Sequence, residues 1–197
     1  MGGTGIIGLF MVYFVGIFMR SAVDSIFDVA FWLADTALNN NEYLQPQKLQ
    51  RMLFLCQSYY AVIHNGRKLM PATFVADEIG PIEPNIYQAF SKGRPSLEVS
   101  LFLDPDIEGF LDSIWSRFGN YSTERLTEMS KETLAYKQAF RHGHRSEISL
   151  ESMMHSFIRA DQTPSVDQVV KPKIMRSQTG RPVAVQAWNP AAMSKKK

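Results

Sequence analysis

Apolar residues recur at helical spacing along much of the chain, beginning near Asp24. Between Asp24 and Leu38 they are three or four positions apart, and three aromatic residues widen the apolar stripe around most of the circumference. This pattern predicts a buried helix that ends at the run Asn39, Asn40 and Asn41.

A second helix is predicted between Gln45-Pro46 and Asn65-Gly66, with proline in its first turn and an Asn-Gly pair as its stop. One face is apolar throughout. At 100° per residue, Arg51, Phe54 and two small residues fall on the opposite face. Phe54 therefore either packs on a second layer or faces a partner, and the second-layer interpretation is slightly favoured because helices in small bundles often have two buried faces.

Residues 71–79 lack a helical period and end at Gly80-Pro81, which indicates a short strand or extended arm. Pro84 can start a short helix, and residues 107–118 repeat the spacing of an amphipathic helix. Plausible N-caps of three further helices are Ser122, Ser130 and Ser149. The fold predicted is mainly α, a compact bundle of about six to seven helices with a short strand or extended arm near residues 72–79.

The two ends of the chain differ from this pattern. Residues 161–197 contain four prolines and scattered basic residues without a periodic apolar face, which predicts a disordered basic tail. Residues 1–20 form an apolar extension with the run GIIGLFMVYFVGIFM, which is either a membrane signal or translated upstream sequence that is not native. We favour the second, because no basic residue precedes the run and it is short for a spanning helix. The helical domain is expected at residues 21–160.

Composition and charge fit an ordinary globular protein of 197 residues, with 45% hydrophobic residues, 20% charged residues and a formal net charge of +2. That charge is too small to favour nucleic acid or membrane as a partner. The single cysteine, Cys56, falls in an apolar stretch and cannot form an internal disulfide, so a cytoplasmic location is expected.

No motif of an enzyme, cofactor site or metal site is present. The four histidines lack ligand spacing, and Cys56 is expected to be a buried, inert thiol. The acidic residues Asp77, Glu78 and Glu83 surround the Gly-Pro turn, but neighbours in a strand point to opposite faces, which argues against a shared catalytic proton. A solvated acidic loop or a salt bridge to Lys48 or Arg51 is favoured over catalysis, and a partner-facing acidic rim is the intermediate interpretation. We expect no enzyme, no metal, no cofactor and no small-molecule substrate.

Two stretches resemble the Panacea-domain family: Leu49 to Ala61 (LQRMLFLCQSYYA) and Ala76 to Tyr87 (ADEIGPIEPNIY). The family pattern joins a Leu-Gln-Lys-Leu-Leu-Tyr helix to an extended arm that leads to Gly-Pro-Val-x-Pro-x-Val-Tyr. Arg51 stands at the usual lysine, and Met129-Ser130-Lys131 departs from the later Leu-Thr-His stretch, so no role of that histidine is carried over. The resemblance spans Ser25 to Ile158 and is greatest to SocA-type proteins.

The resemblance implies a protein-binding antitoxin or proteolytic adaptor that neutralises a toxin encoded nearby or delivers it to a ClpXP-type protease. It also implies that Gly80 and Pro81 pin the arm against the second helix, and that Lys48, Arg51, Tyr59 and Tyr87 either line one groove or hold the arm in place. For Gly80, Pro81 and Tyr87 we favour the second interpretation. The candidate partner-binding residues are Lys48, Arg51, Phe54, Tyr59, Asp77, Glu78, Glu83, Tyr87 and Trp188. The residues expected to be structural are Gln50, Gln57, Gly80, Pro81 and Pro84.

Residues Val183 to Trp188 in the tail would either dock onto a protease or serve only as solubilising disorder. The alternative function is a nucleic-acid-associated regulator, in which the basic tail makes salt-sensitive phosphate contacts. The tail's basic residues ahead of the terminal lysines are Lys171, Lys173, Arg176 and Arg181. A hydrolase built on the acidic residues ranks last.

Overall fold

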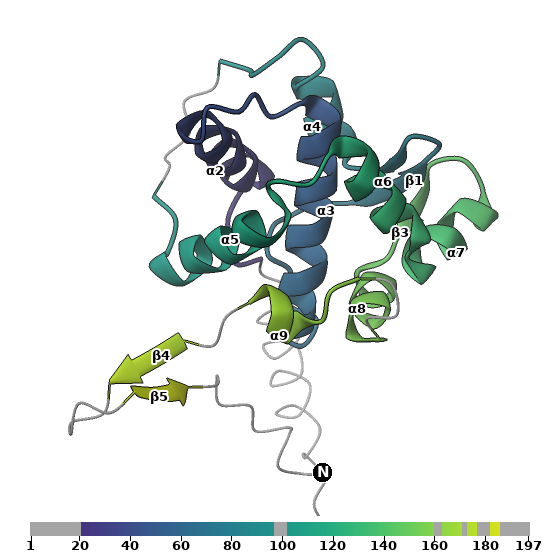
Figure 1. Cartoon of the computed structure of the whole chain (residues 1–197). Helices are drawn as coiled ribbons and strands as arrows, with labels where there is room; N and C mark the ends of the chain where they lie inside the picture. The colour runs from purple at the N-terminus through teal and green to yellow at the C-terminus, as the bar shows by residue number, and fades with distance from the viewer. Residues whose placement is uncertain (1–20, 97–101, 160–162, 171–172, 177–181, 186–197) are drawn as a thin grey trace, which may run out of the picture.

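The computed structural model describes residues 21–96, 102–159, 163–170, 173–176 and 182–185. These residues form eight helices, a three-stranded sheet and a two-stranded hairpin, so the prediction of a mainly helical fold is confirmed (Figure 1). The apolar extension at residues 1–20 lies outside the described part of the chain.

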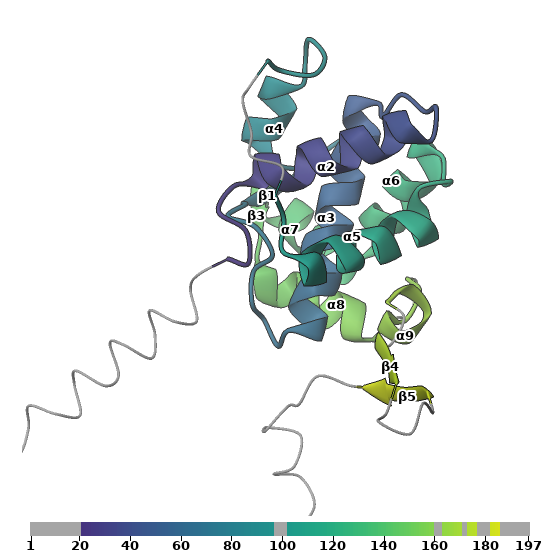
Figure 2. The ribbon, with the colours of Figure 1, turned by 90° about the vertical axis from the view of Figure 1, so that its left-hand side faces the viewer.

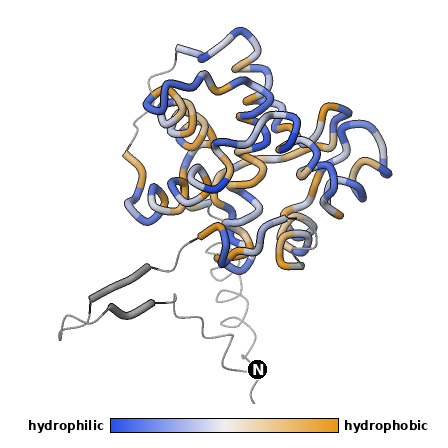
Figure 3. Tube along the Cα trace, viewed as in Figure 1, coloured by the Kyte–Doolittle hydropathy of each residue, from blue (hydrophilic) through white to orange (hydrophobic). Residues whose placement is uncertain are grey.

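The bundle is built around α3 (Pro46–Ile63), the helix predicted from Gln45-Pro46 to Asn65-Gly66. Every residue of α3 from Lys48 to Ala61 is buried, because α2 (Ile26–Asn39), α5 (Pro105–Phe118), α6 (Thr123–Glu132) and α8 (Leu150–Arg159) pack around it. Figures 1 and 2 show α3 running through the middle of the molecule. In Figure 3 the hydrophobic segments gather where the helices face one another.

Local signals at the helix ends explain most boundaries. Ser25 caps α2 through a capping box with Asp28, and Glu83 caps α4 (Pro84–Ala89), in which Pro84 takes the first turn as expected. The predicted caps Ser122 and Ser149 are confirmed, since each hydroxyl accepts a backbone N–H of the helix that follows.

The expected cap at Ser130 is wrong. This residue lies inside α6, and its hydroxyl donates to the Leu126 carbonyl one turn earlier, a bond that lets serine sit within a helix. Thr133 instead caps the next helix, α7 (Leu134–His142), by accepting the N–H of Tyr136.

The predicted strand is confirmed as β1 (Phe74–Asp77), but it is one of three. The chain turns at Glu78 and Ile79, and β2 (Gly80–Ile82) returns antiparallel to β1. A distant segment, β3 (Ser146–Ile148), pairs with the other edge of β1, so that β1 is central. Because β3 has three residues and no turn signal typical of a hairpin, its sequence did not indicate a strand.

The chain has regular secondary structure beyond residue 160. The prediction of a disordered tail from Asp161 is therefore wrong for the described residues of this region. Helix α9 (Val166–Val169) starts with a capping box between Ser165 and Gln168, and Val169 is buried in the core. Two strands, β4 (Lys173–Arg176) and β5 (Pro182–Val185), then pair antiparallel. The prediction failed here because three valines, close together but without a long period, are enough to anchor a single helical turn.

Candidate functional site

The polar residues of α3 bind the backbone of other segments. Arg51 is buried and donates to three oxygens: the Thr127 hydroxyl at 3.0 Å and the carbonyls of Ile79 and Pro81. The two carbonyls flank Gly80 at the turn of the β1–β2 hairpin. We call this arrangement of Arg51, Ile79, Gly80 and Pro81 the hairpin lock.

Glycine is required at the centre of the hairpin lock. Gly80 has φ of +119°, a conformation that other residues rarely adopt, and an added Cβ would lie 2.7 Å from Cζ of Arg51. The guanidinium therefore fills the space that a side chain at position 80 would need. Burial lowers the pKa of Arg51 to about 10, although nearby Tyr136 and Asp77 oppose this, so the group stays charged at neutral pH.

Two glutamines of α3 also bind main-chain groups of other segments. The Gln50 side-chain oxygen accepts the N–H of Glu83 at 2.7 Å, and Gln57 pairs with both backbone groups of Met70 at 3.2 and 3.4 Å. Glu83 in turn accepts the N–H of Ile86 at 2.8 Å and so begins α4. The segment from the hairpin to α4 is thus held to α3 largely by side chains that contact main-chain atoms.

The structure does not bring the candidate groove residues together. Lys48 donates to the Gly119 carbonyl and to Glu42, both at 2.5 Å, whereas the Tyr59 hydroxyl donates to the Pro164 carbonyl at 2.7 Å. Lys48 and Tyr59 therefore face different segments from Arg51. Of the two interpretations of these residues, a shared groove is not formed by Lys48, Arg51 and Tyr59, because each side chain binds a different segment. Arg51 instead holds the arm in place.

Most of the other candidates are also buried. Phe54 packs edge to face against Phe74 and Phe157, with ring centroids 5.6 and 6.0 Å apart, so the second-layer interpretation is confirmed. Six candidates are too buried for direct contact with a partner in this conformation, namely Lys48, Arg51, Phe54, Tyr59, Asp77 and Glu83. Glu78 and Tyr87 are exposed, whereas Trp188 lies outside the described residues.

Asp77 is buried at the end of β1 and Glu78 is exposed in the turn that follows. The salt bridge that Asp77 was expected to form with Lys48 or Arg51 is not present. Asp77 instead accepts a hydrogen bond from Arg145 at 2.8 Å and lies 3.8 Å from His144. Burial raises the pKa of Asp77, but the bonds from Arg145 and the Ile79 N–H and the charges of Arg145 and His144 outweigh it and lower the pKa overall. This carboxylate anchors the loop after α7 to β1.

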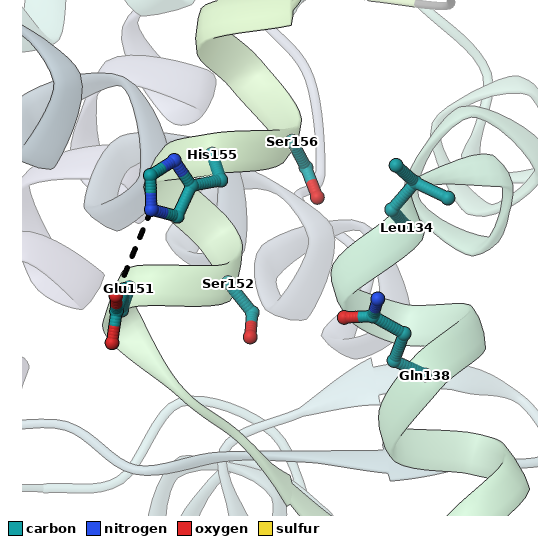
Figure 4. A pocket seen from close by; sticks show the side chains of 6 residues that line it. All are labelled: Leu134, Gln138, Glu151, Ser152, His155 and Ser156. Carbon is teal, nitrogen blue, oxygen red and sulfur yellow. Dashed lines mark ion pairs between the residues drawn. The ribbon is translucent and has the colours of Figure 1, made fainter.

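A groove that the sequence did not indicate runs between α7 and α8. Two adjoining hollows of about 350 and 370 Å³ share Gln138 and Ser152. Figure 4 shows Leu134 and Gln138 of α7 facing Ser152 and Ser156 of α8 across the first hollow. The exposed Glu151 and His155 are 3.7 Å apart on its outer side. The Gln138 amide suits hydrogen bonding to a peptide backbone, whereas the Ser156 hydroxyl already accepts the N–H of Ala135 and the Ser152 hydroxyl accepts the O–H of Ser149, each at 2.8 Å.

Several classes of site are not seen in the described residues. In residues 21–96, 102–159, 163–170 and the hairpin, no group of three or more His, Cys, Asp or Glu side chains is placed to hold a metal ion. Cys56 is buried, as expected, and burial raises the pKa of its thiol. None of the described helices combines the length and hydrophobicity needed to span a bilayer.

Comparison with protein-family models, curated proteins and solved structures found no match to this chain.

Proposed function

We propose that this protein acts by binding another polypeptide, as an antitoxin or proteolytic adaptor that neutralises a toxin encoded nearby or delivers it to a ClpXP-type protease. The observation that carries the proposal is the contact between the two stretches that resemble the Panacea family. Gln50 and Arg51 of the first stretch hold Ile79, Pro81 and Glu83 of the second.

That contact supports the proposal because it gives a physical reason for the two stretches of the Panacea pattern to occur together in one chain. Residues that fix a hairpin against a central helix are expected to recur in proteins with one scaffold. The resemblance therefore bears on the fold and, through the fold, on the class of protein. It does not depend on any catalytic group.

The surface supports the same class of function. The groove between α7 and α8 offers hydroxyl, amide and carboxylate groups at a size suited to a few residues of polypeptide, and Leu134 is 46% exposed at its edge. The cytoplasm is the expected compartment, because the single buried cysteine suits a reducing environment.

The test is co-expression with the products of the neighbouring genes. We expect one of these products to arrest growth alone and to be neutralised by this protein, with which it co-purifies. In the adaptor form of the proposal, the half-life of the toxin rises when the protease's unfoldase is deleted. Growth that is indifferent to this protein while an adjacent toxin is active would contradict the proposal.

Two variants make the test specific to the scaffold. Arg51→Leu removes the hairpin lock and should abolish neutralisation. Arg94→Leu removes an exposed pair with Asp35 on the surface of α2 and should leave neutralisation intact. Equal loss in both variants would indicate general instability, and equal retention would show that the lock is not needed for binding.

A further inference from the structure

Residues Thr163–Val170, here called the cover segment, lie over one end of α3. Their helix α9 contacts α3 and α5, and Figures 1 and 2 show it across the lower end of α3 beside α8. The cover segment thus follows the main bundle in sequence and closes part of its surface.

Beneath the cover segment lies a group of aromatic side chains from three helices. Tyr59 of α3 is fully buried, with ring centroids 5.6 Å from Phe118 of α5 and 4.9 Å from Phe157 of α8. Its hydroxyl donates to the Pro164 carbonyl of the cover segment at 2.7 Å. Burial raises the pKa of this hydroxyl, so it remains a donor at neutral pH.

The cover segment has few attachments of its own. Val169 is buried, whereas Val166 and Val170 are only partly so, and α9 is a single turn, which does not persist in isolation. The Thr163 hydroxyl is buried beside the Tyr59 hydroxyl, with which it interacts as a hydrogen-bond partner.

We propose that the aromatic surface around Tyr59 is a docking site for a partner polypeptide, and that the cover segment occupies this site in the free protein. This inference rests on the proposed function and names its binding surface. The occupant is a segment with valine-sized apolar side chains three residues apart, the spacing of Val166 and Val169. Its main chain supplies the acceptor for Tyr59, as the Pro164 carbonyl does now, and any polypeptide can supply a carbonyl.

The test uses the full chain and a fluorescent peptide with the sequence of Thr163–Val170, TPSVDQVV. Val169→Asp weakens the internal cover segment, whereas Asp167→Asn changes an exposed position of the same helical turn. We expect the Val169→Asp protein to bind the peptide at least about tenfold more tightly than the Asp167→Asn protein, by fluorescence anisotropy. Adding Tyr59→Phe should remove a large part of that gain. Equal binding by the folded Val169→Asp and Asp167→Asn proteins would overturn the proposal.

Hydrogen exchange of the unaltered protein tests the same idea without a variant that could misfold. The Val170 amide, bonded to the Val166 carbonyl at 2.8 Å, should exchange at least about a hundredfold faster than the central amides of α3. Exchange only together with α3 would show that the cover segment never opens alone. A Val169→Asp protein that dimerises instead of binding the peptide would assign the site to a second copy. Neither assay involves the toxin, so failure here leaves the growth test of the proposed function standing.

Discussion

The hairpin lock predicts a specific energetic coupling between Gly80 and Arg51. Gly80→Ala places a methyl group where the Arg51 guanidinium lies, 2.7 Å from Cζ, and forces alanine to adopt φ of +119°. The backbone strain alone is worth about 1–2 kcal/mol. Displacing the guanidinium from one of its two carbonyls adds about 2–3 kcal/mol, since a hydrogen bond to a charged group is among the stronger ones.

Gly80→Ala should therefore lower the free energy of unfolding by about 3–5 kcal/mol in urea denaturation. Gly93→Ala is the matched control, because Gly93 also has a positive φ, +102°, but an added Cβ there meets nothing within 4 Å. It should cost only the strain, about 1–2 kcal/mol.

A double-mutant cycle separates the two terms. Arg51→Leu keeps the aliphatic stem and removes the guanidinium, so in that background Gly80→Ala should cost only about 1–2 kcal/mol, a coupling of about 2–3 kcal/mol. If Gly80→Ala costs the same with and without Arg51, the guanidinium is not what requires glycine, and the argument for the lock is refuted.

Three further predictions concern buried polar contacts. Gln57→Leu leaves both backbone groups of Met70 without their side-chain partner and should lower the free energy of unfolding by about 2 kcal/mol in urea denaturation. Asp77 has a lowered pKa in the folded protein. The stability that its carboxylate gives the fold is therefore fully present above the ordinary pKa of Asp and is lost as the pH falls through the pKa of the folded protein. Between about pH 6 and about pH 3, Asp77→Asn should therefore lose less stability in urea titrations than the unaltered chain. Thr133→Ala removes the cap of α7 and should lower stability by about 1 kcal/mol, whereas the smaller effect expected of Ser130→Ala would confirm where α7 begins.

The helices were predictable because burial imposes a period that a single sequence displays. The stripe through Leu49 and Leu53 and the stop at Asn65-Gly66 locate α3 without reference to any other element. Strand β1 was indicated in the same way by the absence of a helical period in residues 71–79 and by the Gly80-Pro81 stop. Local rules were sufficient wherever the contacts that decide the structure lie within one element.

The rest depended on long-range contacts. Strand β3 exists because β1 offers an edge about 70 residues earlier in the chain, and a three-residue segment carries no periodic signal of its own. The burial of Arg51 could not be inferred from α3, since its partners are main-chain carbonyls, which every residue possesses. The α7–α8 groove depends on how two helices meet, and neither sequence alone encodes that geometry.

The distinction between scaffold and surface also determines where specificity must be sought. Gln50, Arg51, Gly80 and Pro81 are buried and engaged with one another or with the backbone, so they are poorly placed to distinguish one partner from another. Two other surfaces lie apart from the lock: the α7–α8 groove, which is exposed, and the aromatic residues beneath the cover segment, which are buried while that segment is closed. If the protein binds a toxin, exchanging residues of those surfaces should change which toxin is bound, whereas exchange within the hairpin lock should change only whether the protein folds.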